Sequence, residues 1–213
     1  MYRNRLGPMF TVKQDWRRLE KCYYNTDGSH PMQMFARGQL IPFKPSEVWQ
    51  VCQGVVRLST LHLEGEEALL GLAGPSMLFG ACLSILRAYQ ATALSNVYAV
   101  RLSLVEVESS PRLAQDLLYT LSRRLQQTEA LLAIVTQQRV EDRLRQLLGL
   151  LKQEIGQPVQ GGTRLSVRFT HEDLAHSTGS TRVTISRIVG KLKEQGWIAF
   201  DQERHIVLNE RFF

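Results

Sequence analysis

The sequence has few cysteines, and this limits the kinds of metal and redox site that it can hold. Cys22, Cys52 and Cys82 are the only three in 213 residues, and they are widely spaced. No C-x-x-C pair occurs, which excludes the usual ligand patterns of a structural zinc site or an iron–sulfur cluster. We expect the three thiols to be reduced and packed, and we predict no metal ligands.

Signals of catalysis are equally scarce. Only His30 and His62 precede residue 170, and neither lies in a ligand-like motif. The chain has no nucleophile elbow, no P-loop and no dinucleotide-binding fingerprint. A metal-dependent β-barrel enzyme would need clustered histidine and carboxylate ligands. We therefore expect no enzyme activity and name no catalytic residue.

Long apolar runs are also missing. No stretch approaches the ~18 apolar residues of a membrane span, and the first residues lack the apolar core of a signal peptide. We therefore expect a cytoplasmic protein with no membrane partner. The net charge of +6 and the pI near 9.5 are compatible with a polyanionic partner but do not identify one.

Residues 170–198, THEDLAHSTGSTRVTISRIVGKLKEQGWI, contain two short helices separated by a turn. Thr170 can cap the first helix, with Asp173 three residues later in a variant of the capping box. Gly179 interrupts the pattern, as the turn of a helix-turn-helix often requires. Ser180 or Thr181 can cap the second helix.

The second helix has two different faces. Its apolar stripe, at spacing i, i+3, i+4, i+7, consists of Ile185, Ile188, Val189 and Leu192. Its opposite face carries Arg182, Val183, Ser186 and Arg187, and residues 179–193 include four basic residues and no acid. Such a front suits the major groove of DNA, where arginine pairs bidentately with guanine. By periodicity alone, an ordinary amphipathic surface helix with solvated charges is an equal alternative.

The run GSTRVTISRIVGKLKEQGWI closely resembles the recognition helix of the cyclic-AMP receptor/FNR (CRP/FNR) superfamily of bacterial transcription factors. Its GSTRVT core is most similar to the cyanobacterial nitrogen-control (NtcA-like) branch. The resemblance implies double-stranded DNA as partner. The contacts it implies are made by Thr170, Ser180, Thr181, Arg182, Val183, Thr184, Ser186, Arg187 and Lys191. In the cyclic-AMP receptor branch a glutamate stands where this chain has Val183, so we expect a different half-site.

The segment from about residue 32 to residue 104 has a β texture, with short apolar runs punctuated by Gly, Pro, Ser and Asn. Residues 53–58 resemble the turn and strand of the superfamily's β-roll sensor domain. Residues 64–67 predict a hairpin, and the loop at residues 44–47 is shorter than in close relatives. For the basic segment at residues 1–30 we prefer solvated packing to a nucleic-acid arm.

Residues 78–91 are the expected ligand wall of this sensor. Cyclic-nucleotide binders of the superfamily have a glutamate and an Arg-Ser pair here, and this chain has Ala81 and Tyr89-Gln90 instead. We therefore expect no cyclic nucleotide. The nitrogen-control branch implies 2-oxoglutarate as effector. The implied binding residues are Phe79, Gly80, Ala81, Cys82, Arg87, Arg124 and Glu129. Alternatively, Phe79 is core, Gly80 a turn and Arg87 surface.

Residues 111–136 predict a long helix that starts at Pro111. A coiled-coil seam follows from the alternating three and four spacing of Leu118, Leu121, Leu125, Thr128, Leu132 and Val135. A parallel homodimer is the superfamily's arrangement, and packing against the chain's own domain is the alternative. With Leu118 at position a, Arg124 and Glu129 have the spacing of a g–e′ salt bridge between chains. This bridge is an equal alternative to the ligand role and is compatible with it.

The remaining residues predict a winged helix-turn-helix. A helix follows residue 137, residues 156–162 form a loop, residues 165–169 alternate as a strand, and two runs around residues 201–204 form the wing.

The fold class is α+β, with a β-roll sensor and its N-terminal arm (residues 1–110), a dimerisation helix (111–136) and a DNA-binding domain (137–213). We expect a homodimeric transcription regulator, an activator, that binds a palindromic operator and contacts RNA polymerase. Two alternatives stay open, a regulator controlled by protein partners without an effector, and a protein-interaction module.

Overall fold

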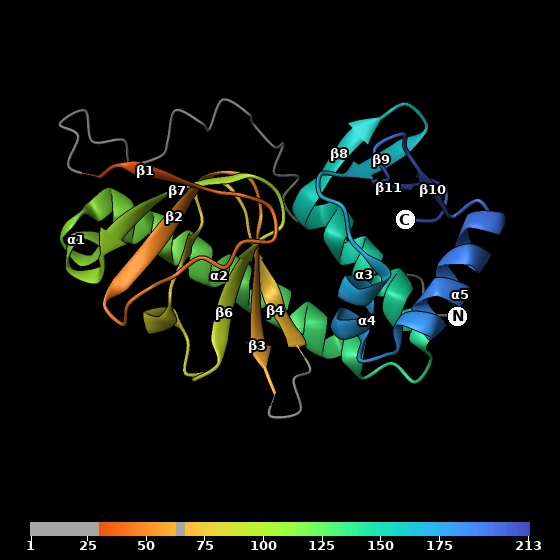
Figure 1. Ribbon diagram of the computed structural model, residues 1–213, viewed down its shortest axis with the longest axis horizontal. Helices are drawn as coiled ribbons and strands as arrows, with labels where there is room; N and C mark the ends of the chain where they lie inside the picture. The colour runs from red at the N-terminus through yellow and green to blue at the C-terminus, as the bar shows by residue number, and fades with distance from the viewer. Residues whose placement is uncertain (1–29, 63–66) are drawn as a thin grey trace.

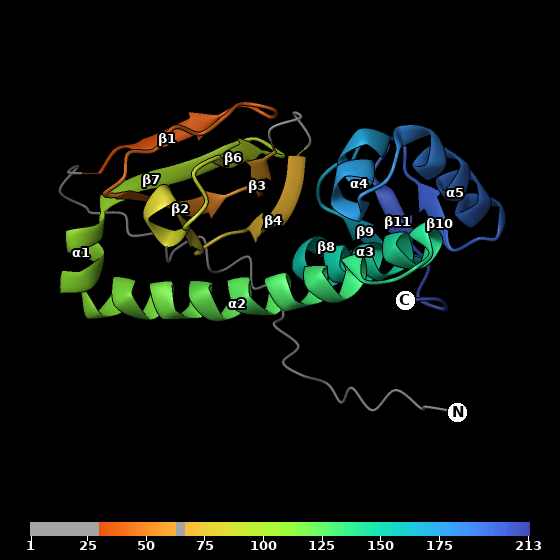
Figure 2. The same ribbon diagram turned by 90° about the horizontal axis from the view of Figure 1, so that it is seen from below.

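The computed structural model describes residues 30–62 and 67–213. It contains an antiparallel β-roll, a long helix that runs beneath it, and a smaller α/β unit at the C-terminal end (Figures 1 and 2). The predicted N-terminal arm, Cys22 and residues 64–66 of the predicted hairpin lie outside the described residues.

Two antiparallel sheets form the roll. One has the strand order β1-β7-β2-β5 and the other β4-β3-β6. The strands are β1 (Met32–Phe35), β2 (Glu47–Gln53), β3 (Val56–Leu61), β4 (Glu67–Ala73), β5 (Leu78–Phe79), β6 (Tyr89–Ala93) and β7 (Val97–Ser103). Alternating apolar residues of both sheets face inward, and Trp49 and Phe79 are fully buried between them. The turn predicted at Gly54 is present, with φ at 92°, and the β-roll expectation is confirmed.

A short 3-10 helix, η2 (Ala81–Leu83), follows β5, and helix α1 (Leu104–Ser109) follows β7. Helix α2 (Pro111–Val135) then begins at Pro111, as predicted, with Ser110 as its N-cap. Its inward face packs under the roll through buried Leu113, Thr120 and Gln127.

The C-terminal unit consists of three helices and a four-stranded sheet of order β10-β11-β9-β8. Its elements are α3 (Val140–Ile155), β8 (Gly156–Val159), β9 (Gly162–Leu165), α4 (His171–Thr178), α5 (Arg182–Glu194), β10 (Ile198–Phe200) and β11 (Ile206–Leu208). The predicted wing corresponds to β10 and β11. Together these elements form a winged helix-turn-helix.

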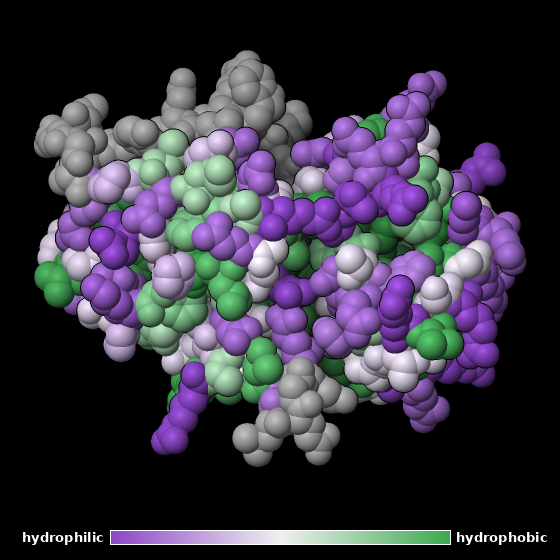
Figure 3. Space-filling model, in the orientation of Figure 1, coloured by the Kyte–Doolittle hydropathy of each residue, from purple (hydrophilic) through white to green (hydrophobic). Residues whose placement is uncertain are grey.

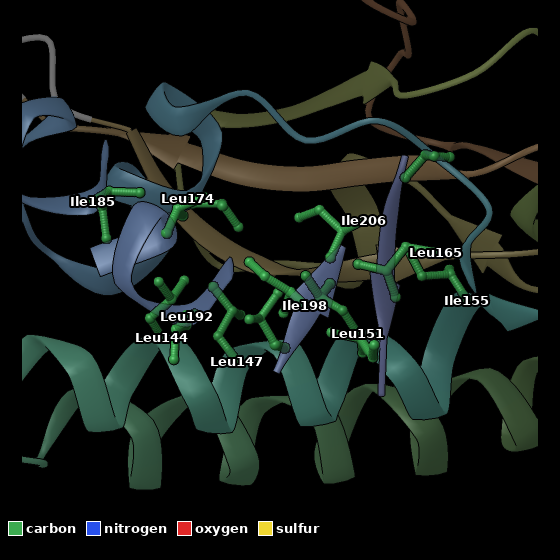
Figure 4. Packing of buried hydrophobic residues seen from close by; sticks show 14 of the residues in the cluster. Leu144, Leu147, Leu151, Ile155, Leu165, Leu174, Ile185, Leu192, Ile198 and Ile206 are labelled. Carbon is green, nitrogen blue, oxygen red and sulfur yellow. The ribbon is translucent and has the colours of Figure 1, made fainter. Parts of the chain in front are cut away.

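One apolar core holds this unit together. Leu144, Leu147 and Leu151 of α3 lie opposite Leu192 of α5 and Ile198 of β10 (Figure 4). The same cluster includes buried residues of the roll and of α2, namely Val55, Leu72, Leu94, Leu131 and Ile134. The two parts of the chain therefore share apolar contacts rather than meeting only at a linker.

Two predictions for the segment before α4 are wrong. Residues 156–159 form β8 instead of a loop, and β9 ends at Leu165, where the predicted strand was to begin. Pro158 is tolerated because β8 is an edge strand of the sheet.

The expectation of three reduced thiols is also wrong. Cys52 is disulfide-bonded. Cys82 is free and partly buried, with its Sγ 3.7 Å from the Glu47 carbonyl oxygen.

No helix within residues 30–62 and 67–213 combines the length and the apolar character needed to cross a membrane.

Candidate nucleic-acid interface and effector cavity

The first helix of the helix-turn-helix begins at the predicted cap. The Thr170 backbone amide donates to Asp173 Oδ2 at 2.8 Å, and the Asp173 amide donates to Thr170 Oγ1 at 3.0 Å. This reciprocal pair satisfies amides that would otherwise be unpaired at the helix start. Gly179 ends α4 in the left-handed conformation, with φ at 58°, which explains why the turn has a glycine.

Helix α5 has the two faces that the sequence predicts. Thr181 is its N-cap and accepts a hydrogen bond from the Thr184 amide. Its rear stripe is buried, and Ile185 and Leu192 have 0% exposure. The front is exposed and includes Thr181, Arg182, Val183, Ser186 and Arg187, while Ser180 and Thr184 are partly buried. Hydrophilic side chains cover the edge of the molecule where α5 lies (Figures 1 and 3).

Val183 is unusual on this front because it is an apolar side chain with 79% exposure. It lies between Arg182 and Thr184, in the first turn of α5. An exposed branched apolar side chain in a polar helix front has the chemistry that contacts the methyl group of thymine.

His171 was not among the residues predicted for this surface. It is the first residue of α4, and its Nδ1 lies 2.8 Å from Ser186 Oγ on α5. The ring therefore lies beside the front of α5 and orients one of its hydroxyl groups. Its position immediately after the cap residue Thr170 is the signal that the sequence offers.

Lys191 already has a partner within the chain. Its Nζ donates to Glu141 Oε2 of α3 at 2.7 Å, and this hydrogen bond lowers the pKa of the Glu141 carboxyl group. A DNA phosphate at Lys191 would compete with that carboxylate. Lys193 is exposed, as Lys191 is.

The residues of the predicted seam form an exposed apolar stripe along α2. The exposed fractions are 69% for Leu118, 61% for Leu125 and 64% for Leu132. Leu121 and Val135 are also exposed, as is Thr128. Leu131 and Ile134, which widen the apolar face, are instead buried in the chain's own core. Beside its inward contacts, the helix thus carries a second apolar stripe that stays exposed within the part of the chain that the structure describes.

A cavity of about 190 Å³ lies between the roll and α2. It is lined by Leu58, Leu78, Phe79, Leu83, Tyr89, Thr120, Leu121, Arg124, Leu125 and Thr128. Two of the predicted effector residues, Phe79 and Arg124, are therefore brought together. Tyr89 and Thr120 add polar groups that the effector prediction did not include.

Arg124 is the cation of this cavity. Its Nη1 donates to the Leu70 carbonyl oxygen at 3.2 Å, and burial lowers the pKa of its guanidinium group. Burial also raises the pKa of Tyr89 to about 12, despite the opposing effects of Arg124 and of the Gly80 backbone amide. At neutral pH, then, a protonated phenol and a guanidinium face the same small space.

The structure does not bring the other predicted effector residues to this cavity. Arg87 and Glu129 are exposed, and Ala81 and Cys82 lie in η2 outside the lining. Gly80 is buried against β2, where an added Cβ would lie 2.5 Å from the Glu47 carbonyl oxygen. Arg124 turns inward to the roll in the single chain, and the g–e′ salt bridge, which needs a second chain, stays a prediction.

Comparison with known proteins accounts for this combination of elements. A model of the Crp-like helix-turn-helix domain matches residues 112–211. Regulatory protein CysR of Synechococcus elongatus is 35% identical over 176 residues, which cover 81% of each chain. The chain belongs to the CRP/FNR family of transcription regulators. The global nitrogen regulator of the same organism is 32% identical, over 85% of this chain and 88% of its own length.

Solved structures agree with the family. A CRP/FNR-family transcriptional regulator from Thermus thermophilus superposes with a TM-score of 0.67 at 28% identity, over 84% of this chain and 94% of its own. The chain is thus a DNA-binding transcription regulator close to the cyanobacterial members of the family, and the resemblance stated from the recognition helix is confirmed.

Proposed function

We propose that this regulator acts as a homodimer on a palindromic DNA operator. The observation that carries the proposal is the pairing of two exposed surfaces on one chain, the basic front of α5 and the apolar stripe of α2. Two chains joined along α2 would present two recognition helices. A two-fold protein reads a two-fold site, with half-sites about one helical turn apart.

The front of α5 supports a specific assignment of roles. Arg182 and Arg187 pair with guanines, since arginine is bidentate to guanine O6 and N7. Val183 contacts a thymine methyl group in place of the cytosine contact that an acidic residue would make. Thr170, Thr181 and Ser186 supply hydroxyl groups to phosphates or base edges, and the resulting half-site differs from one read by a glutamate at residue 183.

Selection of bound duplexes from a random pool, followed by competition binding, tests this function. We expect a palindrome that contains guanine and thymine in each half-site, with affinity that falls steeply as salt rises. Sedimentation at micromolar concentration should give a dimer. A protein that binds all duplexes alike, or none, would be an interaction module whose basic helix meets an acidic partner.

A small anion is the effector that we propose for the cavity between the roll and α2, with 2-oxoglutarate as the candidate. Arg124 supplies one guanidinium group and Tyr89 one neutral hydroxyl group, which together suit a single carboxylate. The second carboxylate has no cation among the described lining residues, because Arg87 lies elsewhere. Cyclic nucleotides are disfavoured, since the ribose and phosphate contacts of the superfamily are replaced here by Ala81 and by Tyr89-Gln90.

A regulator of the same fold without an effector is the second candidate, and one observation favours it. Arg124 already has the Leu70 carbonyl oxygen as an acceptor, so it needs no ligand to be satisfied. Calorimetry with 2-oxoglutarate, cyclic AMP and buffer separates the two candidates.

We further propose activation through contact with RNA polymerase, which transcription in vitro from a selected operator would test.

A further inference from the structure

An ionic bridge joins the roll to the DNA-binding domain within one chain. Arg57 lies on β3, and its Nη1 donates to Asp173 Oδ1 on α4 at 2.7 Å. Its Nη2 lies 3.0 Å from Glu67 Oε2 on β4. The three side chains are 16%, 20% and 16% exposed respectively. Partly buried ion pairs are screened less than surface pairs, so dissolved salt weakens this bridge less than it weakens a fully exposed pair.

The acceptor of the bridge is the residue that closes the capping box of α4. While Asp173 Oδ1 binds Arg57, its Oδ2 accepts hydrogen bonds from the Thr170 amide at 2.8 Å and from Thr170 Oγ1 at 2.7 Å. One carboxylate therefore connects a strand of the sensor to the start of the helix-turn-helix. A second link lies close by in sequence, where Arg37 Nη2 donates to the Arg168 carbonyl oxygen at 3.0 Å.

The arrangement held by this bridge leaves the recognition surface free. Arg182, Val183, Ser186 and Arg187 are all exposed in it, so the contact does not cover the residues that face DNA. We propose that Arg57 is a positioning residue for DNA binding, which holds the recognition helix at a fixed place relative to the roll and to α2.

This proposal rests on the proposed binding of a palindrome by a homodimer. Such a dimer must place two recognition helices about one helical turn apart. A domain that pivots freely loses that freedom on binding, and the loss weakens the complex, whereas a domain already held in place binds more tightly. The bridge thus acts on the spacing between the two helices and not on the contacts of each helix with its half-site.

Strand β4 connects the bridge to the cavity. Glu67 stands at its start, and the Leu70 carbonyl oxygen accepts from Arg124 three residues later. The Leu72 amide and carbonyl both bond to the Gln127 side chain of α2. A displacement of Arg124 would therefore act on β4, whose Glu67 pairs with Arg57.

The experiment compares three duplexes with four proteins. The duplexes are the palindrome selected by the wild type, the same palindrome with one base pair added between its halves, and a single half-site. The proteins are the wild type, Arg57→Gln, Asp173→Asn and the double variant. Asparagine keeps an oxygen that can accept from Thr170, so Asp173→Asn removes the ion pair and leaves the cap chemistry.

A matched control is Arg101→Gln. Arg101 is also an arginine of the roll in an ion pair, with Glu47 at 3.6 Å, but it is far in sequence from the domain contact and 48% exposed. It should bind all three duplexes as the wild type does. Thermal denaturation of each variant checks that the helix-turn-helix remains folded.

We expect Arg57→Gln and Asp173→Asn each to weaken binding to the palindrome about tenfold, as a lost preorganising contact does. In both variants the ratio of affinity for the palindrome to affinity for the palindrome with the added base pair should fall. The affinity for the single half-site should not change. The double variant should be no weaker than either single variant, since the two residues form one interaction. Unchanged affinity for the palindrome, or an equal loss on the half-site, would overturn the proposal. Failure of the wild type itself to prefer a palindrome would instead overturn the proposed function.

Discussion

At the scale of single residues, Gly71 marks the closest approach of β4 to α2. Its φ is +147°, and an added Cβ would lie 2.3 Å from Gln127 Oε1 and 2.4 Å from Arg124 Nη1. Both atoms end flexible side chains, but the Gln127 amide is buried and bonded to Leu72. Relief of the clash would therefore disturb buried hydrogen bonds.

We predict that Gly71→Ala lowers the free energy of unfolding by about 1–3 kcal/mol, through backbone strain and weakened buried hydrogen bonds. Denaturant unfolding followed by circular dichroism measures this. The control is Gly149→Ala in the middle of α3, where an added Cβ meets nothing within 4 Å. That change should instead stabilise the helix, by roughly 0.5–1 kcal/mol.

Arg187 and Lys193 should differ in what they contribute to DNA binding. We predict that Arg187→Ala removes about 1–3 kcal/mol of discrimination against a changed base pair in each half-site, the value of a bidentate arginine–guanine pair. Lys193→Ala should weaken all duplexes alike, because a phosphate contact carries no base information. Competition binding with single-base variants measures both. Full selectivity of Arg187→Ala would show that α5 docks in another way.

Local chemistry explains which residues could be placed from the sequence. Thr170, Gly179 and Thr181 were assigned correctly, since a cap or a left-handed turn depends on neighbours within a few residues. The direction of Arg124 could not be predicted. Its heptad position borders the seam, but the choice between seam and roll depends on the Leu70 carbonyl oxygen, 54 residues away in sequence.

At the scale of elements, α2 has an inward face that packs on the roll and an outward apolar face that is exposed among the residues that the structure describes. We predict that Leu125→Glu, with a charge in the middle of the outward stripe, gives monomers and lowers operator affinity at least tenfold, because an unpaired charge in an apolar interface is costly. Analytical ultracentrifugation and binding assays measure the two effects.

The matched change for Leu125→Glu is Gln126→Glu, which adds the same charge at the next residue, also exposed but outside the stripe. It should leave the oligomeric state unchanged. A wild type that is monomeric at micromolar concentration would contradict dimerisation through the apolar stripe of α2.

The helices and the wing could be predicted from the sequence, and the β8–β9 hairpin could not. Gly156, Pro158 and Gly162 have the composition of a loop. Gly162 lies in a strand because β9 pairs with β11, with Leu208 opposite Thr163, a contact that joins distant parts of the chain. Gly156 and Pro158 lie in β8, which pairs with the other edge of β9. Pairing partners of this kind leave no local periodicity to detect.

At the scale of the whole molecule, the order of roll, long helix and winged helix-turn-helix was predictable because each part has its own pattern. How the parts contact one another was not. The Arg57–Asp173 bridge spans 116 residues in sequence. No sequence motif around either residue predicts contact with the other.

The last prediction concerns coupling between the cavity and DNA. If 2-oxoglutarate binds beside Arg124, it can change DNA affinity only by binding one arrangement of the molecule more tightly than another. The coupling is then reciprocal, so operator DNA must tighten 2-oxoglutarate binding by the same factor as 2-oxoglutarate tightens operator binding. Typical couplings are about 5–150-fold. Two titrations, one of operator with and without 2-oxoglutarate and one of 2-oxoglutarate with and without operator, measure this factor independently.

Arg124→Gln should abolish both effects while leaving unliganded operator affinity near that of the wild type, because glutamine can still donate to the Leu70 carbonyl oxygen. Arg87→Gln should change neither, since Arg87 is exposed and away from the cavity. A response lost in Arg87→Gln and kept in Arg124→Gln would place the ligand outside the cavity. No heat and no shift in the wild type would leave a regulator of this family whose DNA binding is controlled without 2-oxoglutarate.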